Sequence, residues 1–388
     1  MGLKNHLINY ISGNQCTLLA VGPVSVNCVD AAIELSGEYN IPMMLIASRR
    51  QVDSEAHGGG YVNNWTTPQF ADYVQKKDQT GNIILARDHG GPWQNPIEIQ
   101  HNYSLDRAME SAKASYRADI DAGFDVLHID PSIDIHGTPD LDKILNRVFE
   151  LYEYCANYAA QQNRKIVFEV GTEEQSGGIE TNEDLDYLLK RIEAFCKNKD
   201  FHLPMFVVVQ IGTKVMETKN TGILESALKG PQINSNIRQQ IPEIVGICNR
   251  AGVNIKVHNG DYLSEEAIRL HPKLGIHAAN VAPEFAVTET RTLLRLLEEH
   301  SLNKLRERFL ELSYNSGRWK KWMLENTNAS DYDRSVIAGH YVYSTEEFKT
   351  IKRTAGDQLA KKNIDLDQVL KRQIKKQMMR YVRGFKLT

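Results

Sequence analysis

Cysteine is scarce in this sequence of 388 residues. The five cysteines are scattered along the chain, at Cys16, Cys28, Cys155, Cys196 and Cys248. An odd number of widely spaced cysteines fits neither a disulfide framework nor a CxxC metal site. The pattern indicates a reducing compartment, and we therefore expect a cytoplasmic protein.

An excess of positive charge and a long apolar run are also lacking. Lys and Arg number 46 against 49 Asp and Glu, which gives a formal net charge of −3. The chain has no excess of positive charge that would attract the phosphate backbone of a nucleic acid, so we expect no nucleic-acid partner. No apolar run approaches the roughly 20 residues that span a bilayer, and the N-terminus lacks the apolar core of a signal peptide. We therefore expect no membrane partner.

Eight short apolar segments recur through the first 300 residues, with amphipathic stretches between them. They are 17–23, 43–48, 83–89, 126–130, 166–171, 206–212, 254–260 and 275–281. Each is nearly continuous in Val, Ile, Leu and Phe, as expected of parallel strands that are covered on both faces. Capping residues indicate helix starts at Thr67, Thr181 and Ser264. The alternation predicts an α/β fold, a (β/α)₈ TIM barrel over residues 1–300.

The alternation of apolar segments with amphipathic stretches stops after residue 300, and charged helical patterns follow. Residues 301–388 are therefore predicted to form a C-terminal helical extension, packed on the barrel or on a neighbouring subunit of a homo-oligomer. The stretch 371–386 is rich in Lys and Arg. A basic amphipathic helix can lie on a membrane, but we favour a helix that packs on protein and exposes a solvated face.

Polar residues gather where the predicted strands end. The carboxyl ends of barrel strands form one mouth, and catalytic residues lie there. The mouth residues expected here are Asp88, His89, Asp130, Glu169, Glu173, Gln210, His258, Asp261 and Asn280. Imidazoles and carboxylates together suit a divalent ion that accepts nitrogen and oxygen ligands. We predict Zn²⁺, with Mn²⁺ as the alternative.

The predicted metal ligands are His89, His258 and one of Glu169 or Glu173. Glu169 is the first choice, which leaves Glu173 as a catalytic residue beside Asp88, the general acid or base. His128 lies inside a strand, so packing or hydrogen bonding is the favoured interpretation of its role.

The loop after the second strand contains two arginines, a histidine and three glycines, at Arg49, Arg50, His57 and 58–60. Arginine suits bidentate recognition of phosphate or carboxylate, and glycines allow close backbone approach. We predict that this loop covers the mouth and contacts the anionic part of a substrate; a surface loop with solvated arginines is the alternative. Asp130, Gln210 and Asp261 are the other predicted substrate contacts.

Four segments resemble a known family. They are 86–92 (ARDHGGP), 168–173 (FEVGTE) with the glycines 177–178, 257–262 (VHNGDY) and 274–286. In this order they are similar to segments of the accessory, so-called non-catalytic, subunit of class II tagatose-bisphosphate aldolase. The class II fructose- and tagatose-bisphosphate aldolases are more distantly similar.

The resemblance implies a mechanism and part of a site. A Zn²⁺ in the barrel polarises a ketose carbonyl and stabilises an enediolate. Asp88 then corresponds to the proton-transfer residue, His89 and His258 to metal ligands, and Asn280 to a substrate contact.

The chain departs from the aldolases at two places. Lys214 and Val215 stand where the aldolases have a further histidine after strand six, so Glu169, Glu173 or Gln210 is expected to replace that ligand. After strand seven, Asp261 lies in the position of their phosphate cradle, which argues against a bisphosphorylated ketose.

The sequence thus predicts an enzyme, a metal-dependent class II aldolase-type lyase that acts on a sugar or sugar-phosphate. One alternative is a silent subunit that stabilises a partner aldolase. A scaffold has no need of a desolvated cluster such as Asp88, His89 and His258, which argues against it. The other alternative is a metal-dependent sugar epimerase or isomerase, because the same enediolate can be reprotonated.

Overall fold

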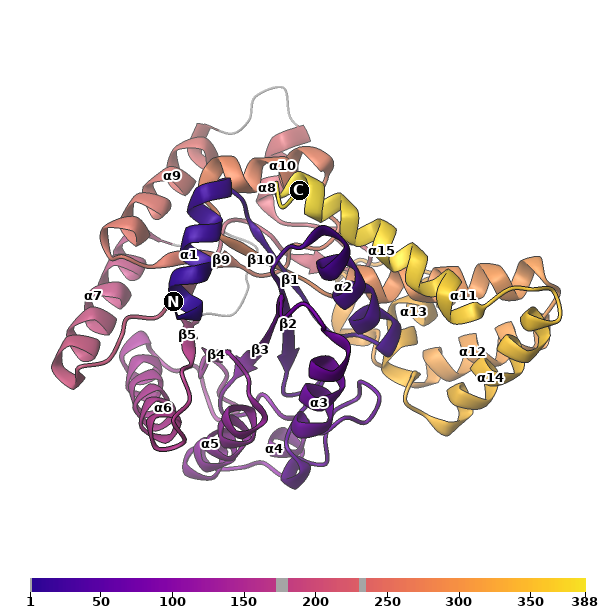
Figure 1. Ribbon diagram of the computed structural model, residues 1–388, viewed down its shortest axis with the longest axis horizontal. Coiled ribbons are helices and arrows are strands. Elements are labelled where there is room, and N and C mark those ends of the chain that lie inside the picture. Colours follow the sequence, from indigo (N-terminus) through magenta and orange to yellow (C-terminus); the bar gives the residue numbers. More distant parts are fainter. Residues whose placement is uncertain (1, 172–180, 230–234) are drawn as a thin grey trace.

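Eight parallel strands form a closed barrel in the computed structural model, which describes residues 2–171, 181–229 and 235–388 (Figure 1). The barrel strands are β1 (Leu18–Val21), β2 (Met43–Ser48), β3 (Ile83–Gly90), β4 (Val126–Ile129), β5 (Val167–Val170), β6 (Phe206–Val208), β9 (Asn254–Val257) and β10 (Ala278–Val281). They follow one another around the barrel in chain order, and β10 closes the circle by pairing with β1. Each strand lies within one of the predicted segments, apart from the last residue of β3, so the predicted (β/α)₈ barrel is confirmed. The pair β7 (Val215–Met216) and β8 (Lys219–Asn220) adds a small antiparallel hairpin that was not predicted.

Helices cover the outside of the barrel and form the C-terminal part of the chain. The α-helices are α1 (Leu3–Asn14), α2 (Val26–Tyr39), α3 (Thr67–Lys77), α4 (Pro96–Gln100), α5 (Leu105–Ala122), α6 (Leu141–Gln161), α7 (Asn182–Lys199), α8 (Ile223–Lys229), α9 (Ser235–Arg250), α10 (Glu265–Leu274), α11 (Pro283–Glu299), α12 (Asn303–Asn315), α13 (Asp331–Ala338), α14 (Glu346–Ala360) and α15 (Leu366–Gly384). Short 3₁₀ helices are η1 (Glu55–His57), η2 (Lys320–Trp322) and η3 (Gly339–Val342). Thr181 and Ser264 cap α7 and α10 as predicted. The cap of α3 is Thr66, one residue before the predicted Thr67, and its backbone N–H donates to the Gln69 side chain.

Buried ion pairs hold β3 in place beneath α5. The Arg87 guanidinium is fully buried and binds both carboxylate oxygens of Asp119, and it also donates to the backbone oxygens of Ala47 and Val52. A buried charge is tolerated only when it is paired and hydrogen-bonded in this way. The strand that carries Asp88 is therefore fixed to β2, to the loop after β2 and to α5.

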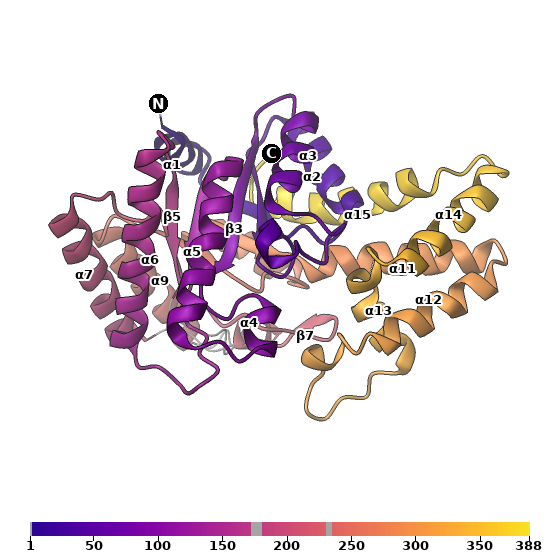
Figure 2. The ribbon, with the colours of Figure 1, turned by 90° about the horizontal axis from the view of Figure 1, so that it is seen from below.

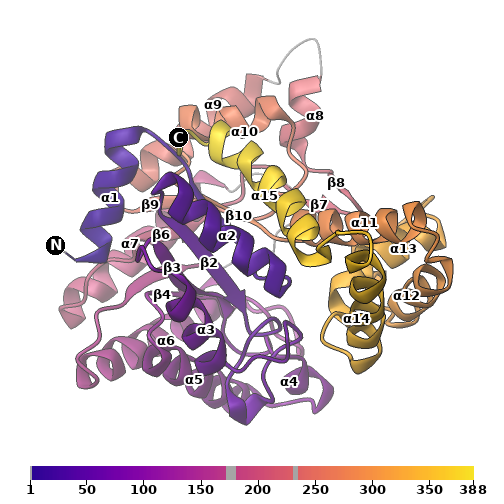
Figure 3. The ribbon, with the colours of Figure 1, turned by 45° about the vertical axis from the view of Figure 1, so that its right-hand side comes forward.

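The C-terminal helices project to one side of the barrel (Figure 2). Helix α11 links the two parts, because Phe285 packs in the barrel core and Leu293 in a second hydrophobic cluster among the C-terminal helices. Helix α15 runs back along the barrel beside α2 (Figure 3). The division of the chain at residue 300 stays a prediction.

Helix α15 carries the basic stretch and packs on the barrel. Met378 and Tyr381 are buried in the barrel's hydrophobic cluster, and Lys371 pairs with Glu34 of α2. The basic face is thus partly matched by acidic groups of this chain. In the part of the chain that the structure describes, no helix is long and apolar enough to cross a membrane.

Candidate functional site

A break in β3 presents two consecutive side chains to the barrel mouth. Successive residues of a regular strand point to opposite faces, so Arg87 points under α5 while Asp88 points inward. The pairing with β4 shifts between Arg87 and Gly90, and His89 has a φ of 43°. This local bulge and left-handed backbone turn His89 inward as well, so that Asp88 and His89 both reach the mouth.

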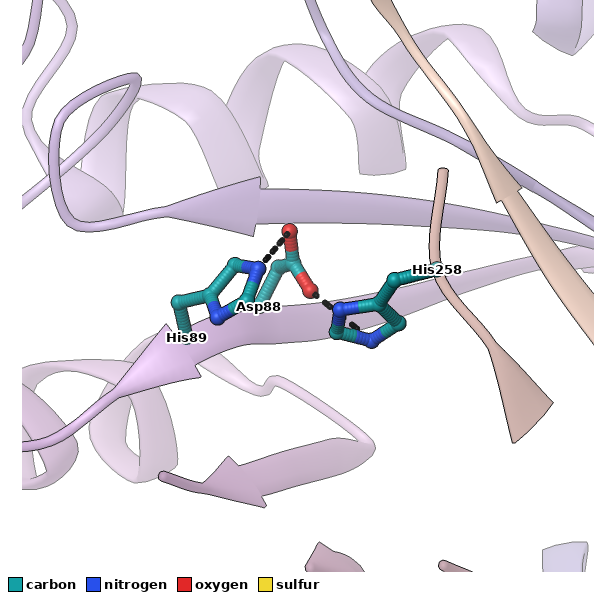
Figure 4. A group of neighbouring side chains, drawn as sticks. All are labelled: Asp88, His89 and His258. Atoms are coloured by element: carbon teal, nitrogen blue, oxygen red, sulfur yellow. Dashed lines mark ion pairs between the residues drawn. The ribbon is translucent and has the colours of Figure 1, made fainter. Parts of the chain in front are cut away.

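Three imidazoles meet at this mouth. The ring centroid of His89 lies 4.8 Å from that of His258 and 5.5 Å from that of His128, and His128 and His258 are 5.3 Å apart. Asp88 lies among them: its carboxylate oxygens are 3.9 Å from His89 Nε2, 3.8 Å from His258 Nε2 and 3.8 Å from His128 Nδ1. Figure 4 shows Asp88 between His89 and His258. The structure therefore brings together the three central residues of the sequence prediction and adds His128.

Two further carboxylates hold the imidazoles in position. Asp130 Oδ2 accepts a hydrogen bond of 2.6 Å from His89 Nδ1. Glu169 Oε1 lies 3.4 Å from His258 Nε2 and 3.7 Å from His128 Nδ1, while its other oxygen binds the buried Lys256 ammonium at 2.6 Å. Carboxylates in these positions orient the imidazole rings.

The cluster has strongly shifted proton affinities. Burial favours the neutral form of Asp88, but His89 and the other nearby cations outweigh it and hold the pKa of Asp88 well below its usual range. Burial likewise lowers the pKa of His89, but Asp88 and Asp130 raise it to a net value of about 9. Burial lowers the pKa of His258 to about 4, so its imidazole is neutral at neutral pH. Glu169 is buried, yet Lys256 and the imidazoles lower its pKa to about 2. Without a bound ion, the ionised carboxylates of Asp88 and Glu169 therefore face the neutral imidazole of His258, and Asp88 also faces the protonated imidazole of His89.

The donor set fits a divalent metal ion. Three overlapping groups of donors lie close enough to share an ion: Asp88, His89 and His258; His89, His128 and Asp130; and His128, Glu169 and His258. Two ligands that are each about 2.0–2.1 Å from a tetrahedral zinc lie about 3.4 Å apart, and His258 Nε2 lies 3.4 Å from Glu169 Oε1. Among the described residues, His258 Nδ1 and His128 Nε2 are buried without a hydrogen-bond partner, whereas Glu169 approaches the other nitrogen of each ring. Imidazole nitrogens and ionised carboxylate oxygens at this spacing suit a zinc-class ion, which would displace the proton of His89 on binding.

A cavity of about 660 Å³ opens over this cluster. Asp88, His89, His258 and Asn280 lie on its barrel wall, and Asn280 Nδ2 donates to Asp88 Oδ1 at 3.1 Å. His128, Glu169 and Lys256 are at most 1% exposed and do not belong to the described lining of the cavity. The cavity has the size of a small-molecule site, and a ligand within it meets Asp88 and His89 first.

The two neighbouring arginines after β2 differ in their surroundings. The Arg49 guanidinium is buried and donates to Asp53, Glu98, Ser111 and the backbone oxygen of Gly91. Arg49 also lines the cavity, but these bonds tie its guanidinium to its own loop, to the segment after β3, to α4 and to α5. Arg50 is half-buried at the cavity wall, and no carboxylate of the described residues lies within ion-pair distance of it.

His57 also lines the cavity, where it is held between two serine hydroxyls. Its Nδ1 lies 2.6 Å from Ser54 Oγ and its Nε2 lies 2.7 Å from Ser111 Oγ. The loop after β2 thus contributes both Arg50 and His57 to the wall of the cavity.

The remaining predicted residues fall in different surroundings. Asp261 lines the cavity, and its Oδ1 accepts the backbone N–H groups of Ala282 and Glu284 at 2.9 and 2.8 Å. Burial and Glu284 raise the pKa of Asp261 well above its usual value. Gln210 is buried outside the described lining of the cavity. Glu173 lies outside the described residues.

Sequence reasoning missed His128 and Lys256, although a signal was present. Residues i and i+2 of a strand share a face, so His128 of β4 accompanies Asp130, which follows that strand, and Lys256 of β9 accompanies His258, which follows β9. It also missed Arg318 and Lys321 on the second wall of the cavity. Their position depends on how the C-terminal helices dock, for which a single sequence offers no signal.

Comparisons with known proteins support the family resemblance. A family model described as D-tagatose-1,6-bisphosphate aldolase subunit GatZ/KbaZ-like matches residues 3–214. The D-tagatose-1,6-bisphosphate aldolase subunit GatZ of Salmonella dublin is 23% identical over 353 residues, which cover 82% of this chain and 78% of the relative.

Solved structures share the fold. A probable tagatose 6 phosphate kinase from Sinorhizobium meliloti 1021 has a TM-score of 0.68 at 17% identity, with 95% of this chain and 100% of that chain covered. A fructose-bisphosphate aldolase from Campylobacter jejuni has a TM-score of 0.55 at 13% identity, with 99% and 95% covered. Because the family model matches more than half of the chain, this protein belongs to the GatZ/KbaZ-like family of D-tagatose-1,6-bisphosphate aldolase subunits.

Proposed function

We propose that this chain is itself an enzyme, a metal-dependent class II aldolase-type lyase that makes or breaks a carbon–carbon bond of a sugar or sugar-phosphate. The observation that carries the proposal is the cluster of Asp88, His89 and His258 at the cavity wall. Desolvated acids and imidazoles with opposed pKa shifts in a cleft are typical of catalytic sites.

We assign His128, His258 and Glu169 as the metal donors, because these three lie close enough to share one ion, and His89, which shares a donor group with His258, as a further donor. Zn²⁺ is the favoured ion and Mn²⁺ the alternative. When bound, such an ion supplies Lewis-acid stabilisation of the negative charge that develops on a carbonyl oxygen. Lys256 neutralises one oxygen of Glu169 and leaves the other facing His258 and His128. Asp130 orients His89 through its Nδ1.

Asp88 is assigned the proton transfer. Its carboxylate lines the cavity and is ionised, and Asn280 holds one of its oxygens by a hydrogen bond. In the cleavage direction a hydroxyl proton leaves, the carbon–carbon bond breaks, and the enediolate fragment then gains a proton at carbon. The group that moves these protons needs to reach the substrate and to be ionised at the start, and Asp88 meets both needs.

The proposal is tested with the purified chain alone, supplied with Zn²⁺ or Mn²⁺ and a panel of ketoses and ketose phosphates. We expect cleavage products, or a carbon epimer if the enediolate is recaptured on its other face. The S. dublin relative is described as a subunit, so a silent stabilising role is the second candidate. No turnover on any substrate, together with activation of a partner aldolase by the Asp88→Asn variant, would contradict the proposal and support the silent role.

A further inference from the structure

The cavity has a second wall that the barrel does not supply. Arg318, Lys321, Trp322 and Tyr341 of the C-terminal helical part line it opposite the strand ends. This part is tied to the barrel side by the hairpin β7–β8, because Glu217 N–H donates to the backbone oxygen of Trp322 at 2.7 Å. The cavity is therefore completed by residues far along the chain from the catalytic cluster.

Three cations line the cavity, Arg50 from the loop after β2 and Arg318 and Lys321 from the C-terminal helical part. The rings of Tyr61 and Tyr341 pack edge to face with centroids 4.9 Å apart. Arg50 adjoins Tyr61, whose backbone N–H donates to the Arg50 oxygen, and the Lys321 ammonium lies 5.5 Å from the centre of the Tyr341 ring. Arg318 lies three residues before Lys321.

These cations have no counter-charge within the part of the chain that the structure describes. Among the described residues, no carboxylate lies within ion-pair distance of Arg50, Arg318 or Lys321, whereas Arg49 nearby has two. The carboxylates of the described cavity lining are Asp88 and Asp261 on the barrel side. Burial and Glu284 favour the neutral form of Asp261, so the described lining sets the single ionised carboxylate of Asp88 against the unpaired cations Arg50, Arg318 and Lys321.

On the barrel side of the cavity, a helix N-terminus already has its backbone N–H groups bonded to a side chain of this protein. Helix α11 begins at Pro283, and backbone N–H groups at such a position are a ready site for a phosphate. Here Asp261 Oδ1 accepts the N–H groups of Ala282 and Glu284, and Asp261 is only 3% exposed. The chain's own carboxyl group therefore takes the donors that an anionic ligand would need.

We propose that the cavity takes a substrate with a single anionic end, a sugar monophosphate, whose phosphate is bound by Arg50, Arg318 and Lys321. The uncharged hydroxyl end then lies toward Asp261 and the catalytic cluster. That the ligand is a sugar rests on the proposed function, whereas its single phosphate rests on the cations and on the helix N-terminus that Asp261 already occupies. Arg318 and Lys321 become specificity-determining residues of the C-terminal extension.

The test is a set of calorimetric titrations of the zinc-loaded full chain with three probes: fructose, fructose 6-phosphate and fructose 1,6-bisphosphate. We expect fructose 6-phosphate to bind at least tenfold more tightly than fructose, and the bisphosphate to bind no more tightly than the monophosphate. The double variant Arg318→Gln/Lys321→Gln should lose at least tenfold in affinity for the monophosphate and keep its affinity for fructose.

Both positions of the double variant are exposed and form no ion pair with the described residues, so the variant should fold. Lys320→Gln is the matched control, because Lys320 is an exposed neighbour in η2 outside the described lining.

Three results would overturn the inference: a bisphosphate that binds tenfold more tightly than the monophosphate, a double variant with wild-type affinity for the monophosphate, or a monophosphate that binds no better than fructose. Turnover is scored separately. Selective binding without turnover contradicts the proposed function alone, and turnover without selectivity for the monophosphate contradicts this inference alone.

Discussion

A single methyl group at Gly171 should disturb the catalytic cluster. Gly171 follows β5, and a Cβ placed there would lie 2.5 Å from His128 Nε2 and 3.2 Å from its Cε1. Because ordinary contact begins at 3.4 Å, the imidazole would have to retreat by about 0.9 Å in a close-packed interior. In Gly171→Ala, His128 therefore has to move.

The size of the effect follows from how tightly His128 is held. Its Nδ1 accepts the backbone N–H of His89 at 3.1 Å, and the ring is 1% exposed, so it has little room to adjust. Metal–ligand distances tolerate deviations of about 0.2 Å. We therefore expect Gly171→Ala to weaken Zn²⁺ binding about 10- to 100-fold and to cost about 1–3 kcal/mol of folding stability through overpacking.

The assay is a competition for Zn²⁺ against a chromogenic chelator, with thermal unfolding measured on the same samples. Gly137→Ala is the matched control, because Gly137 is exposed and a Cβ there meets nothing within 4 Å. A folded Gly171→Ala protein that binds Zn²⁺ within twofold of wild type would refute the assignment of His128 as a ligand.

Three further outcomes are expected. Asp88→Asn should keep the fold and the metal but lower turnover about 10²–10⁴-fold, and unchanged turnover would remove Asp88 from the mechanism. Burial lowers the pKa of His271 to about 4 from 6.5, so the neutral form is favoured in the fold and stability is lost as the pH falls from 6.5 through 4. Urea unfolding of His271→Leu should therefore show a pH slope smaller by up to about 1.4 kcal/mol per unit in that window, and an unaltered slope would contradict this. Arg87→Met should cost about 3–5 kcal/mol because it leaves the buried Asp119 carboxyl without its partner, and Arg87→Met/Asp119→Leu should recover most of that loss in the same unfolding assay.

The barrel was predictable because of where its strands lie. A parallel strand buried on both faces leaves a continuous apolar run, and each of the eight runs became a strand. The hairpin β7–β8 was missed because two-residue strands leave no periodic pattern. The start of α3 was misplaced by one residue because Thr66 and Thr67 are equivalent capping residues in a sequence.

The candidate site was predictable in part. The sequence pointed to Asp88, His89 and His258 because each ends a strand. It does not reveal the bulge that turns His89 inward, nor which of Arg49 and Arg50 meets a carboxylate. The pairing of Arg49 depends on Asp53 and Glu98, which only the folded chain brings close to its guanidinium.

The most direct measurement of the central claim is hydrogen exchange at carbon. The purified, zinc-loaded chain is incubated alone in D₂O with dihydroxyacetone or its phosphate, and deuterium at the carbon next to the carbonyl is followed by NMR. The account predicts that wild type incorporates deuterium, whereas metal-free protein and zinc-loaded Asp88→Asn incorporate it about 10²–10⁴-fold more slowly. Incorporation no faster than in buffer for either compound, or equal rates in wild type and Asp88→Asn, would contradict the claim that this cluster forms an enediolate with Asp88 moving the proton.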